Sequence, residues 1–314
     1  MTLLSKNAEL VGFRLALLAI VCWSSAFLVA RFLLGGDARV DPVSLVFYRF
    51  LIGSAAILGY AAWRKESLRF RSLREFMQML AVAFFMLFLM SLLFFIGQQT
   101  ASAITAALFL ESGPAIIAIV WKLIRRHPTE RREILAVGCG LLGCMFVLNM
   151  ISMRGFHYGF ASWLGQLALI GSAVSWVIGS AIGRKLMAAP NRVVLMGYCE
   201  LASAVMVIPF LFIFHSQLII PAGWGTWGAI VLLGLVPTAA AFIAWSEAMP
   251  RVPLWKLGLL QNLSPVFTLL GAWLFLGEHL SFYNILGIIL VLAGLRMASP
   301  PPPKGRRSAG RHPQ

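Results

Sequence analysis

The stretch FRLALLAIVCWSSAFLVARFLL, residues 13–34, is long and apolar enough to cross a bilayer as one helix. A hydrocarbon core about 30 Å thick needs about 20 predominantly apolar residues. The stretch lacks the small-residue cleavage site of a signal peptide, so we interpret it as the first membrane helix. Similar windows recur along the 314-residue chain, which is 60% hydrophobic and 12% charged, against about 25% charged residues in soluble domains. The sequence therefore predicts an all-α membrane protein.

Polar breaks divide the apolar sequence into ten predicted transmembrane helices. The least distinct break is Gln98-Gln99-Thr100, but one helix from Glu75 to Leu123 would be about 70 Å long at 1.5 Å per residue, so we expect a turn there. The predicted helices are 13–34, 42–63, 75–97, 101–123, 132–151, 160–183, 192–214, 224–247, 252–275 and 281–298.

Lysine and arginine are unevenly shared between alternate loops, which predicts the orientation of the chain. One set of loops carries basic clusters, whereas the other holds only Arg31, Arg39 and Arg154. We expect the basic set to lie on the cytoplasmic side of a cell inner membrane. Because ten is an even number of crossings, both termini are then predicted to be cytoplasmic. The clustered residues are Arg64, Lys65, Arg69, Arg71, Arg74, Lys122, Arg125, Arg126, Arg131, Arg132, Arg184, Lys185, Arg192, Arg251 and Lys256.

The net charge of +15 is explained by these loops and by the ends of the chain. A nucleic-acid-binding protein would gather such charge on one folded face, so we expect no nucleic-acid partner. Residues 1–12 form a short cytoplasmic N-terminus. Residues 299–314, SPPPPKGRRSAGRHPQ, form a basic tail with no apolar content, which we expect to be disordered and able to contact anionic lipids.

An internal repeat appears when the chain is shifted on itself by 150 to 153 residues. It divides the chain into a first repeat, 13–151, and a second, 160–298. Five helices are an odd number, so the second repeat enters the membrane from the opposite side. Inverted repeats of this kind are typical of secondary transporters with a midplane substrate site. The matched pairs are Trp23 and Trp176, Tyr48 and Tyr198, Pro114 and Pro265, and Gly143 and Gly294.

Three segments resemble the drug/metabolite transporter superfamily, and within it the EamA-type carriers. They are WSSAF at Trp23–Phe27, FYRF at Phe47–Phe50, and LSPVFTLLGAWLFLGEHLSFYNILGIILVLAG at 263–294. The resemblance covers residues 13–298 and implies a ten-helix inverted-repeat carrier with a central cavity, commonly exporting amino acids or other small metabolites. The first repeat departs from the pattern, because Arg126 and His127 stand where the second has Gly277 and Glu278.

Three ionisable residues lie well inside predicted helices, where an unpaired charge is costly. In one interpretation, Glu111 and Glu200 face the cavity and bind a substrate ammonium or a proton as the coupling ion. In the other, Arg49 pairs with one of them as a structural tie between helices, and aromatic and backbone groups bind the substrate. The sequence leaves both open.

Prolines and aromatic residues mark the same depth in both repeats. Pro114 and Pro265 fall within predicted helices, where each removes a backbone hydrogen bond, and polar residues flank them, including Gln261 and Asn262. Such a break indicates a midplane site. A proline that only kinks the helix for packing would give the same sequence pattern. The candidate cavity aromatics, which alternatively face lipid, are Trp23, Tyr48, Trp176 and Tyr198.

Other function classes lack their signatures. No HExxH, GxSxG or Walker A motif occurs, so we expect no enzyme, cofactor or metal. A channel is a weaker alternative, which transport kinetics would distinguish. The inverted repeat predicts a secondary transporter that works by alternating access, and the family resemblance implies export of amino acids or related compounds. The alternative is uptake of a vitamin, a nucleoside or another metabolite.

Overall fold

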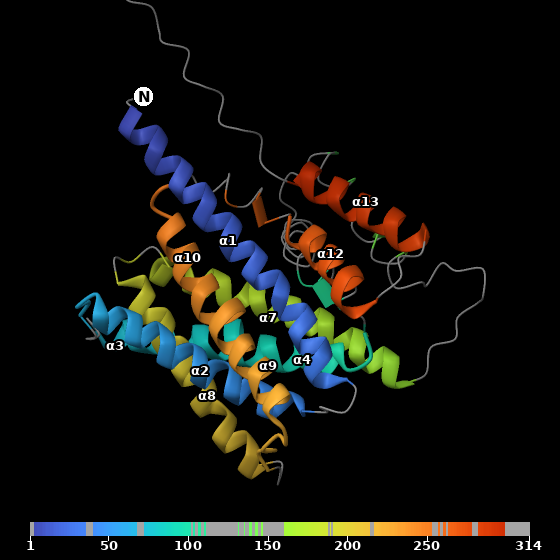
Figure 1. Ribbon diagram of the computed structural model, residues 1–314, viewed down its shortest axis with the longest axis horizontal. Helices are drawn as coiled ribbons and strands as arrows, with labels where there is room; N and C mark the ends of the chain where they lie inside the picture. Colours follow the sequence, from blue (N-terminus) through green and yellow to red (C-terminus); the bar gives the residue numbers. More distant parts are fainter. Residues whose placement is uncertain are drawn as a thin grey trace, which may run out of the picture.

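A computed structural model describes residues 3–35, 40–67, 72–101, 160–187, 191–213, 217–252, 263–277 and 282–298, with isolated positions between 103 and 146 and at 189, 257, 260 and 261. Within these ranges the chain forms helices and no strands (Figure 1). The elements are α1 (Leu3–Leu34), α2 (Pro42–Trp63), α3 (Leu73–Val82), η1 (Ala83–Leu89), α4 (Met90–Gln98), α7 (Phe160–Met187), α8 (Arg192–Ile213), α9 (Trp224–Gly234), η2 (Leu235–Ala240), α10 (Ala241–Ala248), α12 (Ser264–Leu276) and α13 (Phe282–Ala298).

Six helices of the described ranges are long and apolar enough to cross a membrane. They are Asn7–Leu34, Pro42–Trp63, Leu73–Gln98, Trp163–Gly183, Arg192–Phe212 and Trp224–Ala248. Each falls on a predicted span, and the predicted range 42–63 coincides with α2. Asp41 explains this boundary, because its side chain accepts hydrogen bonds from the backbone N–H groups of Val43 and Ser44 at 3.0 Å, which caps the helix.

The turn predicted at Gln98-Gln99-Thr100 is confirmed, since α4 ends at Gln98 and residues 99 and 100 form a turn. The predicted start of the first helix at residue 13 is wrong, because α1 begins at Leu3. No proline precedes Phe13, and Ala8, Glu9 and Leu10 favour helix, so nothing ends the helix where the apolar run does. Most of the predicted helices 101–123 and 132–151 lie outside the described residues.

The ninth predicted helix, 252–275, is not one regular helix. Leu263 forms a turn and α12 starts at Ser264, so Pro265 lies in the first helical turn and not in the middle of a helix. Proline suits this position because its missing N–H would have no intrahelical acceptor there. α12 ends at Gly277, whose φ of 63° is left-handed.

Two of the long spans contain a π-helical segment. η1 lies within the span Leu73–Gln98, between α3 and α4, and η2 lies within the span Trp224–Ala248, between α9 and α10. Serine side chains from neighbouring helices bind the backbone around η1. Ser203 Oγ of α8 donates to the Ala83 carbonyl at 2.9 Å, and Ser175 Oγ of α7 donates to the Phe85 carbonyl at 2.8 Å. π-Helical turns often occur at functional sites.

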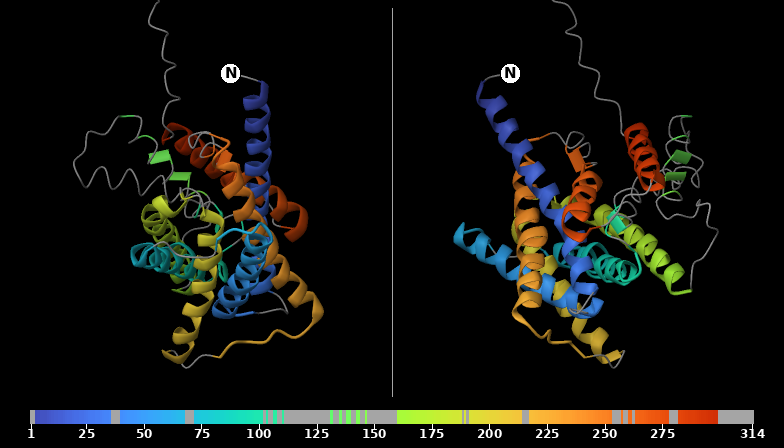
Figure 2. Two further views of the ribbon diagram at one scale, coloured as in Figure 1. Left: turned by 90° about the vertical axis from the view of Figure 1, so that its left-hand side faces the viewer. Right: turned by 45° about the vertical axis from the view of Figure 1, so that its right-hand side comes forward.

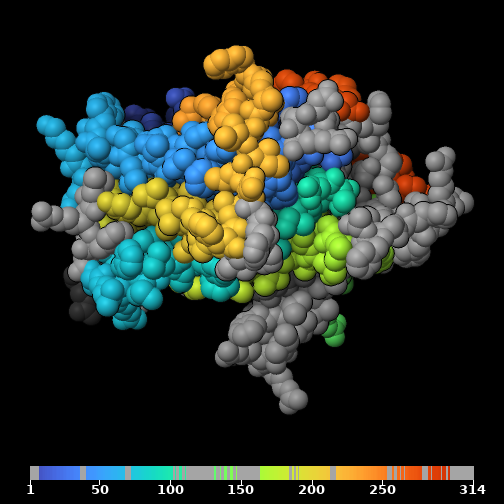
Figure 3. Space-filling view, turned by 90° about the horizontal axis from the view of Figure 1, so that it is seen from below, coloured from blue at the N-terminus to red at the C-terminus, as the bar shows by residue number. Residues whose placement is uncertain are grey.

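The helices pack in pairs that join distant parts of the sequence. α2 packs against α8, α1 against α10 and α12, and α7 against α4 and η1. Seen from below, α8 lies between α2 and the α3–η1 segment, and the connection at residues 217–223 crosses α2 (Figure 3). α12 and α13 lie to one side of this bundle in Figure 1 and in the right-hand view of Figure 2. The helices around α2 and α8 therefore form the centre of the described structure.

Candidate functional site

Arg49 is a buried arginine on α2, 6% exposed, that reaches across to η2. Its Nε donates a hydrogen bond to Thr238 Oγ1 at 2.9 Å. Its Cζ lies 5.2 Å from the ring centre of Phe50 and 5.8 Å from that of Phe95, within the range of cation–π attraction. Arg49 thus connects α2 with η2 and lies against two aromatic rings.

The hydroxyl group of Thr238 is oriented by the backbone of its own helix. Pro237 has no N–H, so the Leu233 carbonyl lacks the donor that an α-helix would supply four residues later. Thr238 Oγ1 donates to this carbonyl at 2.8 Å. With the hydroxyl hydrogen engaged, the lone pairs of Oγ1 remain to accept from Arg49. Sequence analysis missed Thr238, although a Pro-Thr pair inside an apolar span was a visible signal.

Glu200 of α8 is fully buried beside this group, and neither carboxylate oxygen has a hydrogen-bond partner. Arg49 is the charge whose attraction acts on it, yet the Arg49 hydrogen bond goes to Thr238. An ionised carboxylate buried without partners is strongly unfavourable. The structure therefore brings predicted residues Arg49 and Glu200 together without joining them by a hydrogen bond.

Gly53 of α2 allows the three elements to approach one another. A Cβ atom at this position would lie 2.5 Å from Glu200 Oε2 and 2.6 Å from Thr238 Cγ2. Both distances are far below normal contact, so an added side chain would have to displace the Glu200 carboxyl group and the Thr238 side chain. Small residues at helix contacts are typical of membrane proteins, where they let the backbones come close.

Two of the predicted cavity aromatics pack against other rings. Trp23 of α1 contacts Phe242 and Trp245 of α10, with ring centres 5.5 and 5.1 Å apart. Tyr48 of α2 lies against Trp227 at 5.1 Å, and its hydroxyl donates to the Ile219 carbonyl at 3.2 Å. Tyr48 therefore holds the connection at residues 217–223 against α2 by a hydrogen bond.

The remaining predicted residues are spread over the structure. Trp176 and Tyr198 are partly buried against the main core, and Gln261 is partly exposed. Glu111, Pro114 and Asn262 lie outside the described residues.

The break before α12 also carries a polar contact that the sequence did not indicate. Ser24 Oγ of α1 lies 3.1 Å from the backbone carbonyl of Ser264 and 3.3 Å from its Oγ, and both serines are buried. Polar groups therefore lie beside this helix break, on α1 as well as on α12.

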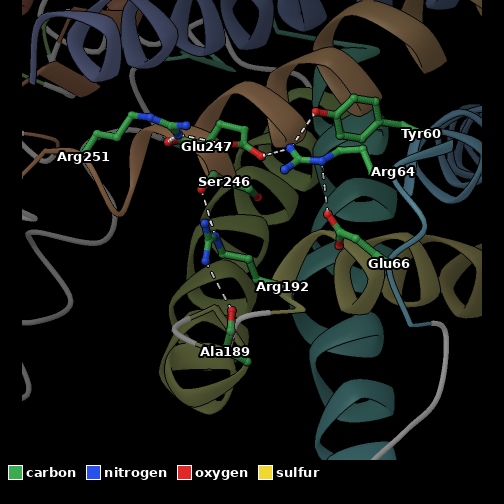
Figure 4. Close-up of polar contacts among 8 residues, drawn as sticks. All are labelled: Tyr60, Arg64, Glu66, Ala189, Arg192, Ser246, Glu247 and Arg251. Carbon is green, nitrogen blue, oxygen red and sulfur yellow. Dashed lines mark hydrogen bonds and ion pairs between the residues drawn. The ribbon is translucent and has the colours of Figure 1, made fainter. Parts of the chain in front are cut away.

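A cluster of charged groups joins the ends of α2 and α10 (Figure 4). Arg64 Nη1 lies 2.6 Å from Glu247 Oε1, and it donates to Tyr60 Oη at 3.1 Å. Arg251 Nη1 lies 2.8 Å from Glu247 Oε2. Arg192, at the start of α8, donates from Nε to the Ser246 carbonyl at 2.8 Å. Three helices are thus held together at one end of the bundle.

A different polar contact connects the C-terminal part of α1 to the end of α4. Gln98 Nε2 donates to the Phe27 carbonyl at 2.6 Å, and Arg31 Nη1 donates to the Gln98 carbonyl at 3.1 Å. The described residues bring no group of three or more His, Cys, Asp or Glu side chains together for a metal ion.

Comparison with known families gives two matches along the chain. The EamA-like transporter family matches residues 10–149 and again residues 163–299. Each match covers one half of the chain, and together they include α2, α8 and η2.

Individual relatives match over most of their length. A probable amino-acid metabolite efflux pump of Salmonella typhimurium is 24% identical, over 90% of this chain and 92% of the relative. The aromatic amino acid exporter YddG of Ancylobacter novellus is 27% identical, over 84% of this chain and 87% of the relative. One crystal structure shares the fold at a TM-score of 0.64 and 24% identity, covering 93% of this chain and 98% of the other.

Proposed function

Because this chain belongs to the EamA-like transporter family, we propose that it exports amino acids or related small metabolites across the inner membrane by alternating access. The protein is a multi-pass membrane transporter rather than an enzyme. Its substrate is a small molecule. The names of the relatives, a probable amino-acid metabolite efflux pump and an aromatic amino acid exporter, support amino acids as the first class to test.

The proposed architecture is ten transmembrane helices in two inverted repeats, 13–151 and 160–298, with both termini cytoplasmic. Matching bounds support it, because α2 and α8 each have 22 residues and start at residues 42 and 192, 150 positions apart. The segments η1 and η2 start at residues 83 and 235, 152 positions apart. The helix contacts repeat in the same way. α7 corresponds to α1 and α10 to α4, and α1 packs on α10 as α7 packs on α4.

The observation that carries the proposal is the placement of a buried arginine and a buried glutamic acid at the contact between the halves. Arg49 comes from the first half, and Glu200 and Thr238 come from the second. A site shared by two halves changes its surroundings when one half moves against the other, as alternating access requires. Glu111 and Glu200 are the proposed carboxylates for a substrate ammonium or a coupling proton, with Gln261, Asn262 and the four aromatics as further proposed contacts.

The ion pair between Arg64 and Glu247 is proposed to close the cytoplasmic end. It joins α2 of the first half to α10 of the second. The basic residues around it agree with a cytoplasmic location. Opening towards the cytoplasm then requires this pair to separate.

Counterflow in proteoliposomes tests the proposed function. Purified protein is reconstituted with unlabelled amino acid inside, and the uptake of labelled amino acid is followed across a panel that includes aromatic members. We expect saturable uptake that depends on the internal amino acid. Absence of counterflow for every amino acid would contradict the proposal, and linear, non-saturating flux would favour a channel.

Glu111→Gln tests the first proposed carboxylate, with transport and membrane abundance measured together. The neutral amide cannot attract a substrate ammonium or release a proton, so we expect transport to fall at normal abundance. Wild-type transport in this variant would remove Glu111 from the site.

A further inference from the structure

Glu200 is a fully buried carboxyl group that the described structure leaves without a hydrogen bond. Both Oε1 and Oε2 lack a partner, and the residue has no exposed surface. Polar groups buried in proteins are nearly always paired. A carboxyl group in this position is far more stable as a neutral acid than as an anion.

Arg49, the cation that acts on Glu200, forms its hydrogen bond with another residue. Arg49 acts on Glu200 electrostatically, but its Nε donates to Thr238 Oγ1 and its Cζ lies near the rings of Phe50 and Phe95. Thr238 can accept this bond because its own hydrogen goes to the Leu233 carbonyl. The Pro237-Thr238 pair thereby fixes Arg49 in a position where it does not pair with Glu200.

The space around Glu200 restricts what it can bind. A single added Cβ atom at Gly53 would lie 2.5 Å from Oε2 and 2.6 Å from Thr238 Cγ2, so a substrate ammonium group, which is about as large as a methyl group, has no room on that side. A proton needs no additional volume. The other groups near the carboxyl are the Cys199 thiol, next to it on α8, and the π segments, whose sequences AFFMLFL and LVPTAA contain no charged residue.

We infer that Glu200 is the proton-coupling site of the transporter, and that Thr238 is a positioning residue that keeps Arg49 from neutralising it. This inference rests on the proposed function and narrows it, since the coupling ion becomes a proton. When the site opens to one side, the carboxylic acid gives its proton to water and the O–H bonding pair stays on the carboxylate. Arg49 stabilises that anion until a proton returns from the other side.

The experiment compares two rates in the same proteoliposomes. The first is counterflow of labelled amino acid at equal pH, and the second is the same counterflow with a pH gradient imposed across the membrane. The readout is the ratio of the gradient-driven rate to the gradient-free rate, which does not depend on the amount of active protein. For the wild type we expect a ratio well above one, at least about fivefold.

Glu200→Gln removes the proton-binding group, and its ratio is expected to fall to one. Glu200→Asp keeps a carboxyl group and is expected to retain a ratio above one. A wild-type ratio of one, or a Glu200→Gln ratio equal to that of the wild type, overturns the inference while leaving the proposed function intact. Absence of wild-type counterflow instead contradicts the proposed function itself.

Thr238→Val tests the positioning role independently of Glu200 variants. It removes the acceptor for Arg49 Nε with little change in volume, so Arg49 is free to turn towards Glu200 and favour the anion. We expect the pH midpoint of gradient-driven transport to move to lower pH, by about one unit. Thr238→Ser keeps the hydroxyl and should leave the midpoint in place.

Thr268→Val is the matched control, because Thr268 is a buried threonine of α12 whose Oγ1 has no partner in the described structure. It should not move the midpoint. An unchanged midpoint in Thr238→Val, or an equal shift in Thr268→Val, overturns the role of Thr238.

Discussion

Gly53 of α2 faces Glu200 of α8 so closely that a Cβ atom at Gly53 would lie 2.5 Å from Glu200 Oε2. The contact joins two helices of equal length that start 150 residues apart. It explains how a carboxyl group comes to be enclosed at the contact between the halves. Any side chain at position 53 must displace the carboxyl group, Thr238 or the helices themselves.

Gly53→Ala is therefore expected to destabilise the protein by about 1–3 kcal/mol, the usual effect of overpacking a core, and to reduce transport. Thermal unfolding in detergent and counterflow measure the two effects. Gly59→Ala, on the same helix, is the control, since a Cβ atom there has no neighbour within 4 Å. It should be neutral or stabilising by up to about 1 kcal/mol. Equal loss in both variants would mean that the contact between Gly53 and Glu200 does not decide the effect.

Arg64→Gln tests the ion pair that joins α2 to α10. Arg64 is exposed on 42% of its side chain, and exposed pairs contribute at most about 1 kcal/mol, so the unfolding temperature should hardly change. We expect the cytoplasmic end to open more often, so that a thiol reagent labels a cysteine introduced at Ser246, which is buried, several times faster.

Arg251→Gln is the control for that experiment, because the side-chain contacts that it removes, with the carboxylate and the backbone carbonyl of Glu247, lie within four residues of Arg251 and do not join α2 to α10. It should leave the labelling rate near that of the parent protein. Equal labelling rates for Arg64→Gln and the parent would show that the pair between α2 and α10 does not hold this end closed.

Ser203→Ala tests how η1 is fastened to α8. Ser203 Oγ donates to the Ala83 carbonyl at the start of η1 and also lies 2.7 Å from the Cys199 carbonyl on its own helix. Hydrogen bonds between membrane helices contribute about 0.6 kcal/mol on average and about 1.7 kcal/mol at most. We expect a loss of stability in this range, measured by thermal unfolding in detergent.

The comparison for Ser203→Ala is Ser25→Ala. Ser25 Oγ donates only to the Cys22 carbonyl within α1, so its replacement should be nearly neutral. Equal effects of the two substitutions would contradict a role of Ser203 between helices.

Tyr48→Phe separates a structural tyrosine from a substrate contact. The variant loses the hydrogen bond to the Ile219 carbonyl but keeps the ring against Trp227. If Tyr48 only fastens the connection at residues 217–223, stability should fall by about 1 kcal/mol or less and the KM for amino acid should stay unchanged. A several-fold rise in KM would place the hydroxyl in the substrate site.

Much of the fold follows from local properties of the sequence. An apolar run of about 20 residues must form a helix in a bilayer, because only a helix satisfies its backbone hydrogen bonds internally. The bounds of α2 could be read directly, since Asp41 and Pro42 give a strong start signal. The start of α1 could not, because a helix continues beyond the apolar run when no residue stops it.

The site was predicted less completely, for a physical reason. The sequence determined that Arg49 and Glu200 are ionisable residues within apolar segments, that matching residues recur after about 150 residues, and that a small-molecule transporter is the class to expect. Only the tertiary structure decided that Arg49 bonds to Thr238, that Glu200 has no partner, and that Gly53 encloses it. Hydropathy and charge are properties of single residues, whereas partners depend on how α2, α8 and η2 pack.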